Sequence, residues 1–332
     1  MKQLILRSVP AGSLAETDFE LQEAEIPKIG EGQVLIKNIL LSIDAANRSW
    51  MQGKTYRDAV KAGDVMPTYS ISEVIESNDE KFKPGQIVSG ESLWAEYSVA
   101  NGRFLMPCPN IKPLSNLLSL FGIAGLTAYH GLTKIGNIKT GETVVVSAAG
   151  GSVGIFVGQI AKAMGCRVVG IAGSDQKCSR VVQELGFDAC INYKNGNLLK
   201  DLKSECPDGI DVYFDNVGGS MLEVVLFRMN MKGRVVCCGA VSQYDGSAPT
   251  GPRNLPGLLI VKRLKMEGFI VMDFVKEHLD AIKHMSALMA EGKIKIVEDI
   301  TEGLENAPKA LLNLLSGGNY GKSMVRVCPD PS

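Results

Sequence analysis

The feature that most constrains the fold of this chain is a strand, a glycine-rich turn and a helix that follow one another at residues 144–162. The strand is the apolar run VVVS, and the small residues AAGG lead into the helical stretch SVGIFVGQIAK. Beyond them, apolar strands alternate with helical stretches as far as GRVVCCGA at 233–240. Because neighbouring parallel strands need a crossover, usually a helix, this alternation predicts an α/β fold with a doubly wound parallel sheet of the Rossmann type.

The two ends of the chain have a different texture. At 332 residues, the chain exceeds the size at which one hydrophobic core usually keeps growing, so two domains are expected. Residues 1–121 contain short β-branched runs between turn residues and predict a mostly β, barrel-like domain. Residues 296–332 lose the alternation and end in a strand-like run. We therefore expect 1–121 and 296–332 to form one domain and 122–295 the other, with a loop at 245–257.

Charge and cysteine usage exclude several classes of protein. Lys and Arg total 35 and Asp and Glu 36, a formal net charge of -1, which leaves no basic footprint for nucleic acid. No run approaches the ~20 apolar residues that span a bilayer, and the start MKQLILRSVP is unlike a signal peptide. The eight cysteines form no CxxC pair and no disulfide-like spacing. We therefore expect reduced cysteines and a cytoplasmic protein that binds neither nucleic acid nor membranes.

The glycine-rich turn carries the strongest chemical signal. Ala148, Gly151 and Gly154 have the spacing Ala-x-x-Gly-x-x-Gly, a variant of the dinucleotide-binding fingerprint. In that motif, small residues let a pyrophosphate approach the backbone at a helix N-terminus. The alternative is a tight turn whose small residues serve only packing. The flanking strand and helix, and the alternation that continues after them, favour a dinucleotide site.

The end of the second strand distinguishes NAD from NADP. An NAD site normally has a carboxylate about 20 residues past the turn, which binds the ribose 2′-hydroxyl. Gly173 and Ser174 stand there instead. Lys177 would supply positive charge for a 2′-phosphate, and Tyr193, after the third strand, would add a hydroxyl donor. We therefore expect NADPH as the cofactor; in the alternative, Asp175 binds an NAD ribose and Lys177 is a solvated charge.

Several longer motifs are similar to those of one protein family. They are AAGGSVGIFVGQIAK (148–162), AGSDQK (172–177), LGFDACINYK (185–194), DNVGG (215–219), CGAVSQY (238–244) and GGNYGKSMVRV (317–327). Nearly the whole chain resembles the leukotriene B4 dehydrogenase, prostaglandin reductase and curcumin reductase group of zinc-independent medium-chain dehydrogenases/reductases. The resemblance implies that 122–295 form an NADP-binding Rossmann domain and that the two ends form a GroES-like, barrel-like substrate domain.

The same resemblance implies cofactor contacts at many positions. The pyrophosphate would lie against Gly151, Ser152, Val153 and Gly154, and the 2′-phosphate against Ser174, Lys177 and Tyr193. The nicotinamide half would be lined by Asn216, Cys238, Gly239, Ala240, Phe269, Ile270, Val271 and Asn319. Each has a plainer alternative, because asparagines are common in turns and apolar residues in a strand are usually core.

Two departures from the group and a shortage of metal ligands bear on the chemistry. The usual Asp-Pro-Tyr-Met-Arg is Asp-Ala-Ala-Asn-Arg here, so Ala46 replaces an aromatic residue, and Val261 stands where many relatives carry a tyrosine. Histidine occurs only at 130, 278 and 284, and Cys108 is the only cysteine before residue 160, so we expect no metal site. Tyr244 is the candidate catalytic proton donor; water is the alternative.

Because no metal site is expected, the kind of substrate that can accept a hydride is restricted. An isolated ketone is harder to reduce without a Lewis acid, whereas a conjugated enone holds the developing charge as an enolate. We therefore expect an enzyme, an NADPH-dependent oxidoreductase that reduces the carbon–carbon double bond of α,β-unsaturated ketones and aldehydes, and we expect a homodimer. A quinone reductase and an NADPH-binding protein without turnover remain as alternatives.

Overall fold

The computed structural model describes residues 1–244 and 251–331, which form two compact units. Unit 1 contains residues 1–118, Tyr244 and 298–331, and unit 2 contains residues 119–243 and 251–297. The predicted loop at 245–257 lies partly outside the described residues. From residue 255 onward that prediction was wrong, because helix α7 (Leu255–Lys262) begins there and Pro256 is compatible with the first turn of a helix.

Unit 2 is built on a six-stranded sheet in which every pairing is parallel. The strands, in spatial order, are β10 (Ala189–Asn192), β9 (Arg167–Ala172), β8 (Thr143–Ser147), β11 (Ile210–Asp215), β12 (Met229–Cys237) and β13 (Lys265–Gly268). The central strand β8 is buried along its whole length, as expected of a parallel strand covered on both faces. The sheet confirms the predicted Rossmann-type architecture.

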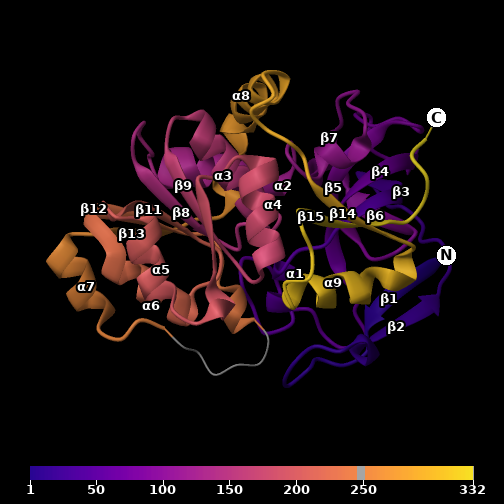
Figure 1. Cartoon of the computed structure of the whole chain (residues 1–332). Coiled ribbons are helices and arrows are strands. Elements are labelled where there is room, and N and C mark those ends of the chain that lie inside the picture. The colour runs from indigo at the N-terminus through magenta and orange to yellow at the C-terminus, as the bar shows by residue number, and fades with distance from the viewer. Residues whose placement is uncertain (245–250, 332) are drawn as a thin grey trace. The chain divides into compact units, whose positions relative to one another are not determined.

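Helices connect and cover these strands (Figure 1). Helix α3 (Gly154–Ala163) packs on β8 and β9 and contacts α2 (Ile123–His130) and α4 (Asp175–Leu185). Helix α5 (Leu198–Glu205) packs against α6 (Gly219–Arg228), and α8 (His278–Ala290) contacts α2. Because the strand order reverses between β8 and β11, right-handed crossovers place the helices before and after the reversal on opposite faces of the sheet.

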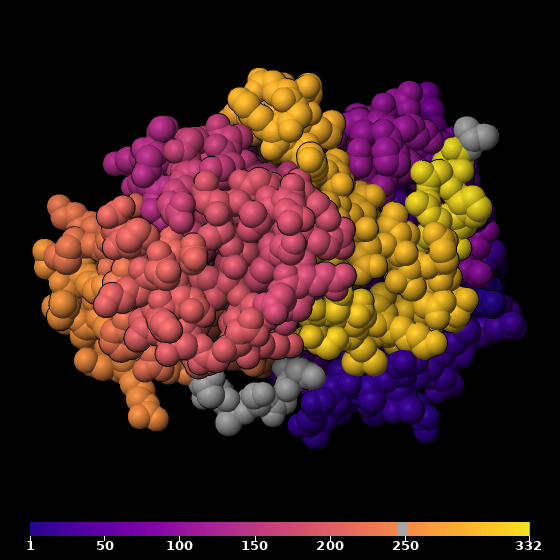
Figure 2. Space-filling view, in the orientation of Figure 1, coloured from indigo at the N-terminus to yellow at the C-terminus, as the bar shows by residue number. Residues whose placement is uncertain are grey.

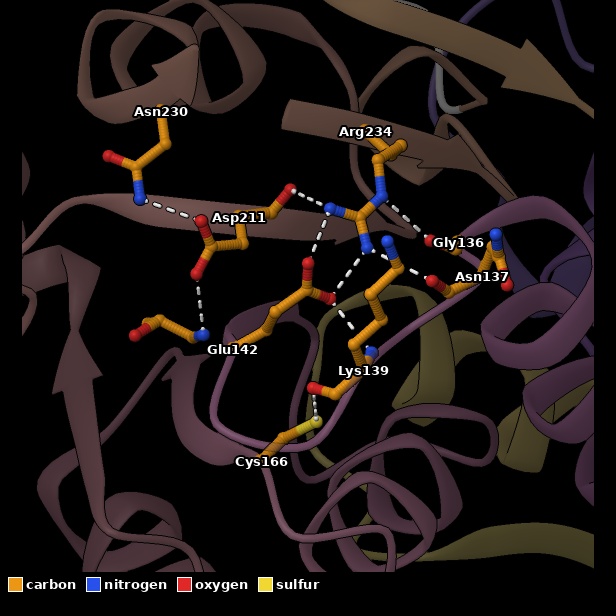
Figure 3. Close-up of polar contacts among 9 residues, drawn as sticks. Gly136, Asn137, Lys139, Glu142, Cys166, Asp211, Asn230 and Arg234 are labelled. Carbon is orange, nitrogen blue, oxygen red and sulfur yellow. Dashed lines mark hydrogen bonds and ion pairs between the residues drawn. The ribbon is translucent and has the colours of Figure 1, made fainter. Parts of the chain in front are cut away.

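The amino ends of the central strands are joined by Arg234 of β12 (Figure 3). Its guanidinium donates to both carboxylate oxygens of Glu142, at 2.9 and 2.6 Å, and to the carbonyls of Gly136 and Asn137. Nearby, the Asp211 carboxylate accepts from the backbone N–H of Thr143 at 2.9 Å. These charge-assisted bonds join β8, β11 and β12 at the end opposite to their carboxyl termini.

Unit 1 is built on a mixed seven-stranded sheet. Its main path runs β14 (Glu298–Glu302), β15 (Lys322–Arg326), β3 (Gln33–Ser42), β4 (Pro67–Ser77), β5 (Ile87–Leu93) and β7 (Leu105–Pro107), and β6 (Tyr97–Asn101) also pairs with β3. Strands β1 (Lys2–Leu6) and β2 (Phe19–Glu23) form a separate antiparallel pair. Because β15 pairs with β3, the C-terminal segment belongs to this unit, together with α1 (Ala46–Ser49) and α9 (Ala307–Leu315).

Short helical segments complete the described structure. They are η1 (Glu16–Asp18), η2 (Gly102–Phe104), η3 (Leu114–Leu117), the π-helical η4 (Gly131–Ile135), η5 (Tyr193–Asn195), η6 (Val241–Gln243), η7 (Val271–Glu277) and η8 (Leu304–Asn306). None of the described helices combines the length and the apolar character that crossing a membrane requires.

Candidate functional site

The candidate site lies in unit 2 at the carboxyl ends of β8 and β11. The two strands are neighbours, but the chain leaves β8 toward β9 and leaves β11 toward β12, in opposite directions along the sheet. Ligands of open α/β sheets bind at such a reversal. The parallel register, which pairs Phe214 with Val146, brings Ser147 and Asp215 to the same edge.

The turn after β8 has the geometry of a phosphate cradle. Ala148 adopts a positive φ of 51°, an uncommon conformation for a residue with a side chain, and its carbonyl accepts the Gly151 N–H at 2.9 Å. Helix α3 then begins at Gly154, and its N-cap residue, Val153, makes no side-chain capping bond. A helix N-terminus attracts anions, so the turn fits a pyrophosphate.

The two glycines of this turn have different surroundings. A Cβ at Gly154 would overlap the carbonyl of Ala148, whereas a Cβ at Gly151 would lie 3.1 Å from that oxygen. Gly154 is buried, while Gly151, Ser152 and Val153 are half-buried. Gly154 therefore serves the packing of helix on turn, and the accessible backbone that could meet a ligand lies at 151–153.

Asp215, which the sequence analysis did not select, organises the neighbouring loop. Its Oδ1 accepts from the Tyr213 hydroxyl at 2.9 Å, from the Ser147 hydroxyl at 3.2 Å, and from the backbone N–H groups of Val217 and Gly218. Burial raises the pKa of this carboxyl, and those hydrogen bonds act in the opposite direction. The signals in the sequence were its position at the end of an apolar strand and its place in the DNVGG motif at 215–219.

The predicted nicotinamide residues of unit 2 surround this loop. The Asn216 side-chain amide donates to the Ser147 carbonyl at 2.8 Å, and the N–H groups of Cys238 and Gly239 donate to the Asp215 carbonyl. Ala240 lies beside Gly218, since a Cβ on that glycine would come within 3.3 Å of the alanine methyl. The segments after β8, β11 and β12 are therefore hydrogen-bonded into one assembly.

The predicted nicotinamide contacts that follow β13, residues 269–271, have different surroundings from those near Asp215. The Phe269 ring packs edge-on against Phe214, with ring centroids 6.5 Å apart. Val271 is buried and Ile270 is exposed. Val271 is thus buried like a core residue, the plainer interpretation of its sequence, whereas Phe269 is half-buried.

At the carboxyl end of β9, Ser174 and Asp175 are engaged within the protein. Ser174 is the N-cap of α4, and its hydroxyl accepts the Lys177 N–H at 3.2 Å. The Asp175 carboxylate accepts the side-chain amides of Asn192 and Asn195, both at 2.9 Å. These two amides direct the carboxylate toward η5, which weakens the interpretation that Asp175 binds an NAD ribose.

The structure adds one cation to the predicted 2′-phosphate residues. Lys177 is half-buried and Tyr193 is 42% exposed. A Cβ on Gly173 would lie 3.6 Å from the Tyr193 hydroxyl and 3.5 Å from the Cε of Lys194, so both side chains lie beside this strand end. Lys194, which the sequence analysis did not select, lies two residues after the end of β10, and a positive charge next to Tyr193 was the available signal.

The remaining predicted residues, Tyr244 and Asn319, belong to unit 1. The Tyr244 carbonyl accepts the Gln52 side-chain amide at 2.7 Å, and its side chain is half-buried. Asn319 is buried, and its amide donates to the Gly321 carbonyl at 3.0 Å, as a turn residue would. Of the two departures from the family, Ala46 begins α1 in unit 1, whereas Val261 is 67% exposed on α7 in unit 2.

The histidines gather in one aromatic cluster of unit 2. The rings of His130 and His278 lie 5.3 Å apart, and Tyr129 O–H and His284 Nδ1 are 3.0 Å apart. Within residues 1–244 and 251–331, no group of three His, Cys, Asp or Glu side chains is placed to hold a metal ion.

Two families match the chain in consecutive parts. Residues 2–108 match a family described as the N-terminal domain of oxidoreductase, and residues 152–291 match one described as zinc-binding dehydrogenase. Together the two matches span more than half of the chain.

Similar proteins match almost the full length. The NADPH-dependent curcumin reductase of Escherichia coli is 39% identical, covering 99% of this chain and 97% of that protein. The NADP(+)-dependent 2-alkenal reductase of Nicotiana tabacum is 41% identical (98% and 97%), and prostaglandin reductase 1 of Bos taurus is 40% identical (98% of each). The crystal structure of CurA from Vibrio vulnificus in complex with NADPH superposes with a TM-score of 0.94 at 37% identity, covering 99% of this chain and 100% of that one. The chain therefore belongs to the medium-chain dehydrogenase/reductase superfamily, in the zinc-independent group that contains the curcumin, prostaglandin and 2-alkenal reductases.

Proposed function

We propose that this protein uses NADPH to reduce the carbon–carbon double bond of α,β-unsaturated ketones and aldehydes. The observation that carries the proposal is the carboxyl edge of the parallel sheet, where the glycine turn before α3 and the Lys177, Tyr193 and Lys194 group fit the two phosphate sites of one dinucleotide. The family supports the reaction, since a 2-alkenal carries a double bond conjugated to its carbonyl.

In this proposal the residues of unit 2 bind and orient the cofactor. The backbone at 151–153 and the N-terminus of α3 hold the pyrophosphate, while Lys177, Lys194, Tyr193 and Ser174 receive the 2′-phosphate. The loop hydrogen-bonded to Asp215 supports the nicotinamide side through Asn216 and residues 238–240. We also keep Phe269, Ile270, Val271 and Asn319 as proposed contacts through backbone groups. Unit 2 is then the NADP-binding domain, and unit 1 the substrate domain.

The chemistry of the acceptor follows from its conjugation. Bound NADPH would supply a hydride to the β-carbon of the double bond, and the conjugated carbonyl would hold the charge as an enolate. We propose Tyr244 as the group that delivers the proton, because its backbone is anchored by Gln52 and its ring is half-buried. A Tyr244→Phe variant should then lower kcat by about 10²-fold with little change in the Kd for NADPH. An unchanged kcat would assign the proton to water.

An isotope experiment tests the reaction itself. With NADPH carrying deuterium at the transferred position and an enone such as 3-nonen-2-one, mass spectrometry should find the label on the β-carbon of a saturated ketone. Deuterium on the carbonyl carbon, in an allylic alcohol, would make the enzyme a carbonyl reductase. Quinones tested in parallel examine the alternative: oxidation of NADPH by quinones but not by enones would replace the proposed substrate class.

We also propose a homodimer formed through the exposed edge of unit 2. Strand β13 is the last strand of the parallel sheet, and α7 nearby (orange in Figures 1 and 2) exposes Ile260 at 72% and Val261 at 67%. Exposed apolar patches commonly mark protein interfaces. Light scattering during gel filtration should give twice the mass of 35.6 kDa, and Val261→Asp should shift it to the monomer.

A cytoplasmic location is proposed as well. All eight cysteines are free thiols in the described structure, as expected in a reducing compartment. Fractionation of cells that express the tagged chain should recover it with cytoplasmic markers.

A further inference from the structure

Two cysteines of unit 2 lie in direct contact at the edge of the parallel sheet. Cys178 is in the first turn of α4, and Cys190 is on β10, the edge strand. Their sulfur atoms are 2.9 Å apart and both are thiols. Cys190 pairs in register with Gly170 of β9, and a Cβ on that glycine would come within 3.1 Å of the Cys190 sulfur. The missing side chain of Gly170 therefore leaves the space that the Cys190 sulfur occupies.

The two thiols are chemically unequal. The Cys190 thiol donates a hydrogen bond to the Cys178 sulfur, and this bond lowers the pKa of Cys178 against the opposing effects of burial and the Asp175 carboxylate. The same hydrogen bond, together with burial, raises the pKa of Cys190. The thiolate is the nucleophilic form of cysteine, so the direction of this hydrogen bond favours Cys178 as the attacking sulfur and Cys190 as the resolving one.

A small oxidant can reach this pair. A cavity of about 290 Å³ is lined by both cysteines and by polar residues of β10, η5 and α5, among them Asn192, Asn195 and Asp201. Cys178 is 8% exposed and Cys190 is half-buried. Helices α4 and α5, which cover opposite faces of the sheet, both lie on the side of unit 2 that is turned toward the viewer in Figure 1, and Figure 2 shows that side as a pink to salmon surface.

The dithiol adjoins the proposed 2′-phosphate site. Cys178 follows Lys177 directly, and Cys190 lies three residues before Tyr193 in the chain. A covalent S–S bond is ~2.05 Å long, so closure from 2.9 Å would draw the sulfurs together by about 0.85 Å. This closure would pull the first turn of α4 toward β10 and shift Lys177 and Ser174 relative to Tyr193.

We propose that Cys178 and Cys190 form a redox-sensitive dithiol that a hydroperoxide converts to a disulfide, and that this disulfide weakens binding of the cofactor beside it. The Cys178 thiolate attacks the hydroperoxide, an S–O bond forms as the O–O bond breaks, and an alcohol or water leaves. The Cys190 sulfur then attacks the sulfenic acid, and the S–O bond breaks with release of water. The thiols lose two electrons and two protons, which the hydroperoxide gains. Only the effect on the cofactor rests on the proposed function.

Mass spectrometry of the folded protein tests the disulfide without reference to activity. After brief treatment with hydrogen peroxide, two of the eight thiols should be lost, and peptides containing Cys178 and Cys190 should be linked until dithiothreitol is added. Cys190→Ser should lose the link and accumulate sulfenic acid at Cys178, which dimedone traps. Cys328→Ser, at a half-buried cysteine of unit 1, should retain the link. Peroxide products without this link would overturn the dithiol.

Titration with NADPH, followed by cofactor fluorescence, tests the coupling. The oxidised protein should bind NADPH about three- to tenfold more weakly than the reduced protein, because charge-assisted contacts depend closely on distance. Dithiothreitol should restore the affinity, and Cys190→Ser should bind as the reduced protein does before and after brief oxidation. Equal affinities of the linked and reduced proteins would overturn the coupling. Failure of the reduced protein to bind NADPH would contradict the proposed function instead. The link between the Cys178 and Cys190 peptides would still test whether the dithiol forms a disulfide.

Discussion

At the scale of single residues, the turn after β8 separates a folding requirement from a binding requirement. Gly154 faces the Ala148 carbonyl so closely that any side chain would displace backbone, whereas a methyl group at Gly151 would require the same oxygen to move by only a few tenths of an ångström. Both positions belong to one sequence motif, and the motif alone gives them equal weight. Only the path of the chain between Ala148 and α3 shows which glycine serves which purpose.

A matched pair of alanine variants tests this separation. Gly154→Ala should lower the free energy of unfolding by about 1–3 kcal/mol, because overpacking against backbone forces the turn to shift. Gly151→Ala should change stability by less than about 1 kcal/mol, yet raise the Kd for NADPH at least about tenfold, since the methyl group occupies space needed for the pyrophosphate. Urea denaturation and fluorescence titration measure the two effects. Equal losses of stability would refute the distinction.

A second residue-scale prediction concerns the choice between NADPH and NADH. Losing a charge-assisted contact costs about 1.5–3 kcal/mol, so Lys177→Ala should raise the Kd for NADPH at least about tenfold and leave that for NADH almost unchanged. Asp175→Asn is the matched control, because its carboxylate is held by Asn192 and Asn195. It should leave NADH binding unchanged; a clear loss of NADH affinity in this variant would restore the interpretation that Asp175 binds the ribose.

At the scale of elements, the two ends of the parallel strands have different roles. The carboxyl ends carry the candidate site, while the amino ends carry the Arg234 network. The side chains of Arg234 and Glu142 are only 18% and 19% exposed, so their ion pair is screened less than one at the surface.

Replacement of Arg234 should therefore lower the stability of the protein and leave its binding of NADPH almost unchanged. Arg234→Ala should lower the free energy of unfolding by about 2–3 kcal/mol, because a half-buried carboxylate and three backbone carbonyls lose their donor. Arg234→Lys should recover only part of this, since an ammonium group cannot reproduce the bidentate contact with Glu142. The Kd for NADPH should stay within about twofold of the original in both variants. Full recovery by lysine would show that charge alone matters at this position.

The strands and helices of unit 2 were largely predictable, because each is encoded by a local pattern. The VVVS strand, the turn and the helix appear in order, and Ser174 is the N-cap of α4, a position at which serine is favoured. Helix α7 was missed from residue 255 because glycine and proline dominate the preceding composition, although proline is compatible with a first helical turn. Local sequence patterns therefore predicted the strands and helices of unit 2, except where a residue type such as proline is compatible with both a loop and a helix.

At the scale of the whole molecule, the contacts between residues far apart in the chain could not be predicted from the sequence. Asp215 joins β8 to β11 through Ser147, 68 positions earlier, and Cys178 meets Cys190 only because α4 folds back on β10. No periodicity or motif specifies such a pair, since its geometry depends on strand order and register. The C-terminal strand β15, by contrast, could be assigned to the N-terminal unit from its change of texture, and it pairs with β3.

The three histidines lead to a prediction for the stability of the whole chain. His130 is fully buried, and neither of its ring nitrogens has a hydrogen-bond partner among the described residues. Burial, with smaller contributions from His278 and Lys134 against Glu277, lowers the pKa of His130 to about 4. In the unfolded chain a histidine has a pKa of about 6.5. Below that value the unfolded state binds a proton that the native state does not, so the free energy of unfolding should fall as the pH drops from about 6.5 toward 4.

Urea denaturation at pH 7.0, 6.0, 5.0 and 4.5 measures this dependence and assigns it to one side chain. His130→Phe should keep the stacking on Phe274, whose ring centroid lies 5.0 Å away, and remove the titration, so its stability should decline less steeply with acid. His284→Gln is the control, because His284 is exposed, and its slope should match that of the original protein. Carboxylates of the native structure titrate in all three proteins and cancel in the comparison. If His130→Phe declines as steeply as the original protein, the acid sensitivity lies in other groups, and the buried ring is accommodated in its charged form.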